Sequence, residues 1–158
     1  MIKPGKSRFV VLIICMICGN GMAQSDYLKQ PLPLVQYDKN VEGPLNAIEL
    51  KQLKEVYGDQ LNNYVLSRPN FLKAVKDILR NRVEIIELSD PKDQKECTLL
   101  SQVPVLSAFV SDLKRDQFFD RSTFNPLKYN FRFFNRGASM YRVDNTNYFI
   151  LVKSQHHR

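Results

Sequence analysis

Four basic residues near the end of the chain stand beside aromatic residues: Lys128, Arg132, Arg136 and Arg142. Cationic groups next to rings can bind phosphate or carboxylate groups, or stack against the bases of single-stranded nucleic acids. Here Tyr129, Phe131 and Phe133 alternate with the polar residues, which is the period of a strand with one buried face. We therefore expect the four basic side chains to lie on a solvated strand face. A site for anionic glycans or lipids is the alternative.

A second group of possible chemical interest is acidic: Glu84, Glu87, Asp90, Asp93 and Glu96. General acid–base catalysis needs two carboxylates that converge on a cleft. The first two residues fall on an expected strand and the others in the loop that follows it, so convergence is not indicated. A glycan-active or other hydrolase using residues 84–96 is the alternative function, and no catalytic residue is nominated.

The remaining reactive side chains give no motif. His156 and His157 are adjacent and almost terminal, a placement that does not enclose a metal ion. Neither a Ser–His–Asp arrangement nor a glycine-rich phosphate loop is recognisable, so no metal or cofactor is predicted. Cys97 is expected to be a small buried hydrophobic residue, with an intermolecular disulfide or a reactive thiol as alternatives.

The first 23 residues have the layout of a secretory signal peptide. Lys3, Lys6 and Arg8 precede an apolar run over 9–18, and small residues follow it, with cleavage expected between Ala23 and Gln24. A membrane-spanning helix needs about 20 apolar residues, and this run is roughly half as long. Lipidation of Cys18 is the alternative, although bulky residues precede that cysteine.

Export would change the charge of the chain. The full sequence has 23 basic and 16 acidic residues, a net charge of +7. Without the three basic residues of the leader, 20 basic and 16 acidic residues remain, a net charge of +4. This excess favours anionic surfaces but is too small to predict a nucleic-acid partner, which an exported protein rarely meets.

The mature chain is expected to begin with an extended arm over 24–45, because Pro31, Pro33 and Pro44 favour extended backbone. The arm either packs on its own domain or reaches toward a partner. A single domain is expected over 46–158.

Two helices are predicted after the arm. Asn46 and Glu49 have the spacing of a capping box, and an apolar stripe follows that Gly58 can divide: Leu50, Leu53, Tyr57, Leu61 and Tyr64. Pro69 suits the first turn of a second helix. Its predicted apolar face holds Phe71, Ala74, Val75, Ile78 and Leu79, and the opposite face holds Lys73, Lys76, Asp77 and Arg80.

Beyond residue 82 the pattern changes to strands, expected over 83–88, 103–110, 129–133, 139–143 and 148–153. Turn residues separate the last three strands. Helices followed by hairpin-linked strands predict an α+β domain, with two or three N-terminal helices packed on a C-terminal antiparallel sheet.

The stretch Asn125-Pro126-Leu127-Lys128-Tyr129, the aromatic segment after it and the stretch from Tyr141 to Tyr148 together resemble the end of small exported proteins of unknown function from Bacteroidota. A leader that ends in Ala23-Gln24 is similar to leaders of that group. The resemblance implies a lineage and a location in the periplasm, at the outer membrane or in the medium, and it transfers no activity and no functional residue. We expect a non-enzymatic accessory or interaction protein of the envelope. Its partner is expected to be an envelope protein or an anionic glycan or lipid surface, with no membrane span in the mature chain.

The expected cleavage can be tested directly. The exported protein should begin at Gln24, which intact-mass and N-terminal analysis would show. A retained leader, or a diacylglycerol group on Cys18, would contradict this prediction.

Overall fold

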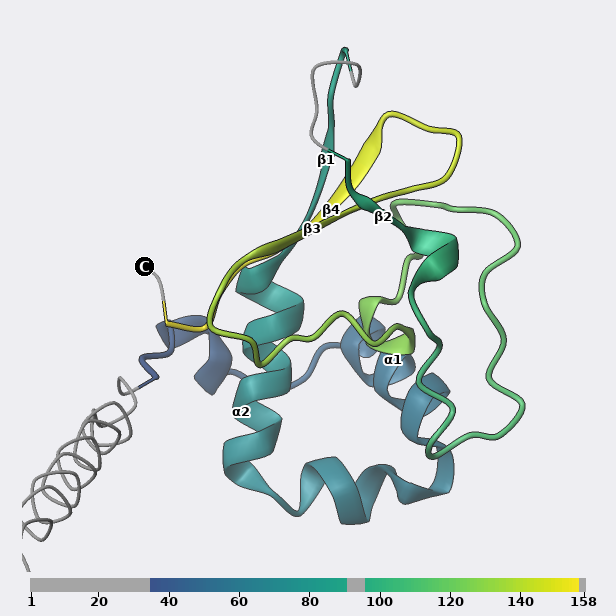
Figure 1. Cartoon of the computed structure of the whole chain (residues 1–158). Coiled ribbons are helices and arrows are strands. Elements are labelled where there is room, and N and C mark those ends of the chain that lie inside the picture. The colour runs from purple at the N-terminus through teal and green to yellow at the C-terminus, as the bar shows by residue number, and fades with distance from the viewer. Residues whose placement is uncertain (1–34, 91–95, 157–158) are drawn as a thin grey trace, which may run out of the picture. The chain divides into compact units, whose positions relative to one another are not determined.

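Residues 35–90 and 96–156 are described by a computed structural model, in which two main helices lie beside a four-stranded sheet (Figure 1). The predicted leader, its cleavage site and the first part of the arm lie outside the described residues, as do Asp93 and His157. The described part is an α+β fold, as predicted. No helix within it has both the length and the apolar content needed to span a bilayer.

Helix α1 (Ala47–Tyr57) begins at the predicted capping box. The Asn46 side chain accepts a hydrogen bond from the Glu49 backbone N–H, and the Glu49 carboxylate accepts one from the Asn46 N–H, at 2.8 and 2.9 Å. The helix ends at Gly58, whose φ of +49° is a left-handed conformation that glycine adopts without steric cost. The chain continues through the 3-10 turn η4 (Gly58–Gln60) and the π-helical turn η5 (Asn62–Leu66). Gly58 therefore divides the apolar stripe, as predicted.

Helix α2 (Pro69–Asp77) begins with the predicted proline and runs through the π-helical turn η6 (Ile78–Arg82) into the sheet. The charged face opposite the apolar one is not left to solvent, because Lys76 and Asp77 are buried. Residues 35–45 cover this face, including the 3-10 turn η3 (Lys39–Glu42). The Lys76 ammonium donates to the carbonyls of Val41 and Gly43 at 2.9 and 2.8 Å, which replace the water it loses.

Arg80, which lies in η6 directly after α2, joins α2 to α1 through an ion pair and to the covering segment through hydrogen bonds. The Arg80 guanidinium lies 2.5 Å from the Glu49 carboxylate, and the two side chains are only 16% and 6% exposed. Arg80 also donates to the carbonyls of Asn40 and Pro44. The hydrogen bond from Arg80 lowers the pKa of Glu49, so this carboxylate stays charged at neutral pH.

The sheet has the order β1-β4-β3-β2, with β1 (Val83–Glu87), β2 (Thr98–Leu99), β3 (Ser139–Arg142) and β4 (Tyr148–Val152). Strand β4 is antiparallel to both β1 and β3, with Ile150 opposite Ile85 on one side and Tyr141 on the other. Strand β2 is parallel to β3, so the sheet is mixed and the prediction of a wholly antiparallel sheet is wrong. A long connection over 100–138 separates β2 from β3, and parallel pairing requires such a crossover.

Two of the predicted strands, 103–110 and 129–133, are irregular. They meet at one bridge between Val105 and Tyr129. Pro104 cannot donate to a strand ladder, and Arg132 has a φ of +54°, which ends any extended run. Tyr129 and Phe131 are nevertheless buried, and Arg132 is exposed as predicted.

The segment over 124–133, irregular apart from the 3-10 turn η9 (Pro126–Lys128), connects two apolar clusters. Leu127 packs in the helical cluster with Leu53, Val56 and Val75. Phe124, Tyr129 and Phe131 pack in the second cluster, under the sheet, with the following core residues: Leu100, Val103, Tyr141, Val143, Ile150 and Val152. This segment therefore fixes the sheet against the helices.

Glu49 and Glu42 form a matched pair of substitutions. Glu49→Gln should cost about 3 kcal/mol at neutral pH, because it leaves the Arg80 charge without its buried partner. Glu42→Gln breaks an ion pair with Lys73 that has a similar N–O distance, 2.7 Å. The side chains of Glu42 and Lys73 are 63% and 38% exposed, so the loss of stability should be only about 0.5 kcal/mol. Urea unfolding measures both values, and equal losses would contradict this account.

The effect of Glu49→Gln should also depend on pH. Because Arg80 lowers the pKa of Glu49 from its ordinary 4.5, the stabilisation is complete above about pH 4.5. It is lost as the pH falls through the lower pKa of the folded state. The stabilities of the wild type and the variant should therefore converge in acid.

Candidate ligand-binding pocket

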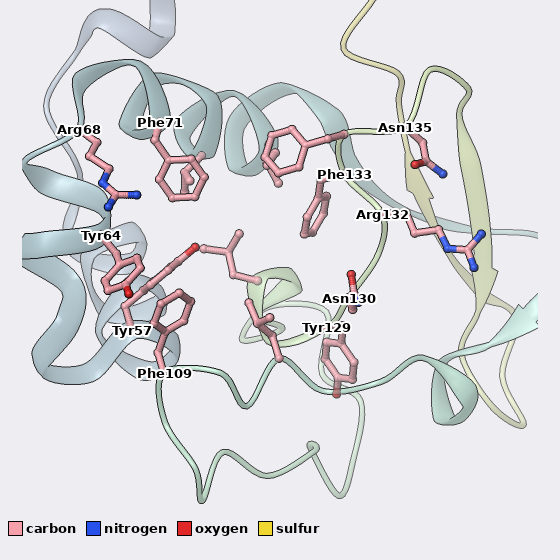
Figure 2. Close-up of a pocket in the computed structure, with 15 residues that line it drawn as sticks. Tyr57, Tyr64, Arg68, Phe71, Phe109, Tyr129, Asn130, Arg132, Phe133 and Asn135 are labelled. Atoms are coloured by element: carbon pink, nitrogen blue, oxygen red, sulfur yellow. The ribbon is translucent and has the colours of Figure 1, made fainter.

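An aromatic pocket of about 420 Å³ lies where the end of α1, η5, α2 and two irregular segments meet (Figure 2). Seven rings line it: Tyr57, Tyr64, Phe71, Phe109, Tyr129, Phe133 and Phe134. Tyr64 and Phe134 are 40% and 55% exposed, so rings remain in contact with water.

The first wall is a series of aromatic side chains in contact, tilted or edge-on to one another, followed by an arginine. The Phe109 ring lies between Tyr57 and Tyr64, with centroid distances of 4.8 and 4.7 Å. The Arg68 guanidinium lies 5.0 Å from the centroid of the Tyr64 ring. Tyr57 is the last residue of the apolar stripe within α1, and Tyr64 continues the stripe past Gly58. The same periodicity that packs the helix therefore supplies this wall.

The second wall belongs to α2 and η6. Phe71, Val75 and Ile78 recur at spacings of four and three, which places them on one helix face. Leu106 and Leu127 add apolar side chains from the irregular segments. The predicted apolar face of the second helix therefore contributes both to the core and to the pocket.

The third wall comes from the end of the irregular segment. The positive φ of Arg132 starts a turn, closed by a hydrogen bond of 3.0 Å from the Asn135 N–H to the Arg132 carbonyl. Phe131 stays in the core, while the turn brings Phe133 and Phe134 to the pocket. Figure 2 shows the Arg132 side chain directed toward the strands, away from the aromatic rings.

The polar groups of the pocket are cations and hydrogen-bond donors. Arg68 and Arg132 line it, together with Asn130 and Asn135. Burial raises the pKa of Tyr57 and of Tyr129, so these phenols stay neutral at physiological pH. Among the described residues that line the pocket, none is Asp, Glu, His, Cys or Ser. The lining can bind and orient a ligand, but it offers no carboxylate or imidazole for proton transfer.

Lys128, predicted on a solvated face, is buried instead. Its ammonium pairs with Asp116 at 2.5 Å and with Glu55 at 3.0 Å. Burial by itself would lower the pKa of Lys128, but the hydrogen bonds to the two carboxylates raise it above its ordinary value. Lys128 is therefore a charged structural group in the fold and does not face a ligand.

The other predicted basic residues are not brought together. Arg132 lines the pocket. Arg136 is exposed at one end of the β3–β4 hairpin, where its carbonyl accepts from the Ser154 hydroxyl. Arg142 lies at the other end, donating to the Thr146 carbonyl at 3.2 Å, with its guanidinium 5.8 Å from the Phe149 ring. The four residues do not form one site.

The acidic group also fails to form a site within the described residues. Glu84, Glu87, Asp90 and Glu96 are exposed, and none of them lines the aromatic pocket. Glu84 pairs with Lys153 at 2.5 Å. The described residues hold no group of three or more His, Cys, Asp or Glu side chains arranged to bind a metal ion. His156 and Cys97 are half-buried, the latter just before β2.

Sequence reasoning missed the pocket because its residues were assigned to other roles. Helical periodicity assigns Tyr57, Tyr64 and Phe71 to helix packing alone. Phe109 falls within the expected strand over 103–110, and Arg68 belongs to no predicted pattern. One signal was present, since the stripe continues past Gly58 to Tyr64 after the helix has ended. Comparison of the chain with protein-family models, with curated proteins and with solved structures gives no match.

Three substitutions test the placement of the irregular segment. Lys128→Ala should cost about 2 kcal/mol, less than for a fully buried pair because Asp116 and Glu55 can be partly hydrated. Phe131→Ala should cost about 3 to 5 kcal/mol, as large core truncations do. Arg132→Ala should change stability by about 0.5 kcal/mol or less. Urea unfolding distinguishes them, and a Lys128→Ala loss as small as that of Arg132→Ala would contradict the burial of Lys128.

Proposed function

We propose that this chain is an exported, non-enzymatic accessory protein of the bacterial envelope that binds a small apolar ligand in its aromatic pocket. The single observation that carries the binding role is the hollow lined by seven rings, with no carboxylate or imidazole among its described lining residues. Support for export comes from the charged leader, the small residues before Gln24 and the resemblance to exported Bacteroidota proteins.

The size and lining of the pocket suit a small molecule. Small-molecule sites have volumes of roughly 300 to 1,000 Å³, mostly apolar walls and a few polar groups that orient the ligand. This pocket has about 420 Å³, seven rings and two arginines. Tyr64 and Phe134 would lose contact with water when a ligand enters. Each Å² of apolar surface buried in this way makes the free energy of binding more favourable by about 25 cal/mol.

The walls are held in place before any ligand arrives. Phe109 is packed between two tyrosines, while Val75 and Ile78 belong to the helical core. A ligand therefore does not have to order these side chains, and the entropic cost of binding is reduced.

A hydrolase using residues 84–96 is the weaker hypothesis. It would need carboxylates converging on a cleft, whereas Glu84 is paired with Lys153. The described members of the group are exposed: Glu84 and Glu87 on β1, Asp90 after that strand and Glu96 before β2. The geometry favours the binding role.

The test uses N-phenyl-1-naphthylamine, a neutral apolar probe whose fluorescence rises when it leaves water. It should bind the wild-type protein, and Phe109→Ala should weaken binding about tenfold or more, the equivalent of about 1.4 kcal/mol, by removing the central ring of the first wall.

The matched control is Phe118→Ala, which removes the same ring from a loop position that is 86% exposed and outside this pocket. It should leave probe binding unchanged. Circular dichroism and thermal unfolding check that both variants fold. A probe that does not bind the wild type, or equal losses in both variants, would refute the proposal.

A further inference from the structure

We infer that the ligand is a small organic carboxylate with an apolar body, whose carboxylate binds Arg68 at the end of the pocket near α2. This inference rests on the proposed binding function and specifies its ligand class. The apolar body would lie against the aromatic walls.

The position of Arg68 is fixed by its neighbours. It precedes Pro69, and its φ of −118° and ψ of 86° keep it out of the helix, as expected before proline. Its guanidinium lies over Tyr64 at 5.0 Å, and Figure 2 shows it on the same side of the pocket as Tyr64 and Phe71. A guanidinium stacked on a ring still presents N–H donors at its edge, in a planar fork that matches a carboxylate.

The charge of Arg68 is not neutralised within the described structure. The ion pairs of the described residues use other cations: Lys73, Arg80, Arg82, Lys128 and Lys153. Arg80 and Lys128 serve the fold, and their carboxylate partners are already engaged. Arg68 has a ring beside it and no such partner, so its hydrogen-bonding edge can receive a ligand.

The rest of the lining is also suited to an anion. No described lining residue carries a carboxylate that would repel the ligand, and the second arginine of the lining, Arg132, has its side chain directed away from the rings. Arg68 is exposed, so water and salt screen part of its charge, and its planar fork supplies direction as well as attraction. Arginine is also more weakly hydrated than lysine, so bringing an anion to it costs less desolvation.

The test compares two ligands that differ in charge and share their rings, 2-naphthoate and 2-naphthamide, by displacement of N-phenyl-1-naphthylamine. The wild-type protein should bind naphthoate about tenfold or more tightly than the amide, as charge-assisted hydrogen bonds predict. Arg68→Gln should remove this preference, because it should lower the affinity for naphthoate and leave the affinity for naphthamide unchanged. Decanoate and decanamide, compared in the same way, show whether the apolar body is a ring system or an acyl chain.

The matched control is Arg136→Gln, which removes the same charge from an exposed position outside the pocket and should keep the preference. Arg68→Lys, which keeps the charge and loses the planar fork, should retain part of the preference for naphthoate over naphthamide.

The outcomes separate the two proposals. If the neutral probe binds but neither carboxylate is preferred over its amide, the inference fails and the proposed function stands. If Arg68→Gln weakens naphthoate and naphthamide equally, Arg68 has a structural role and the inference fails. If the neutral probe does not bind the wild type, the proposed function fails and this inference fails with it.

Discussion

The ammonium of Lys128 is held between Glu55 of α1 and Asp116 of the long loop, and its side chain is 6% exposed. A charge removed from water in this way is tolerated only with close partners of opposite sign. Neighbouring polar contacts reinforce it, since Asn125 donates to the Gln52 carbonyl and to the Glu55 carboxylate, both at 2.9 Å. The start of the irregular segment is therefore attached to α1 by polar groups.

Apolar anchors then fix the rest of that segment. Leu127 belongs to the helical cluster, and Tyr129 and Phe131 belong to the cluster under the sheet. Arg115 strengthens the second anchor, because it donates to the carbonyls of Leu100 and Val103 and lies 5.4 Å from the Tyr129 ring. The chain can turn at Arg132 and place two phenylalanines on the pocket wall only because the preceding residues are held on both sides.

Five cations of the domain illustrate two different roles. Lys76, Arg80 and Lys128 have buried or half-buried side chains that interact with carbonyls or carboxylates, and they stabilise the contacts between segments distant in sequence. Arg68 and Arg132 have no ion-pair partner among the described residues and line the aromatic pocket. The same residue types build the fold in one place and remain open to a ligand in another, and burial and pairing distinguish the two roles.

The sequence by itself determined the features that depend on residues close together in the chain. Asn46 and Glu49 cap α1, Pro69 begins α2, Gly58 ends the first helix, and the β3–β4 hairpin forms around 144–147. These features follow from hydrogen bonds and backbone preferences within a few residues, which a local pattern contains.

Only the tertiary structure decided the burial of Lys128 and Lys76, the parallel pairing of β2, and the pocket. Alternation around Tyr129 indicated a strand, but Glu55 neutralises Lys128 from far along the chain and the backbone turns at Arg132. The pocket joins α1, η5, α2 and two irregular segments, and none of them contains the site alone. Such contacts depend on which distant groups can satisfy a buried charge or cover a ring, and local periodicity holds no information about those partners.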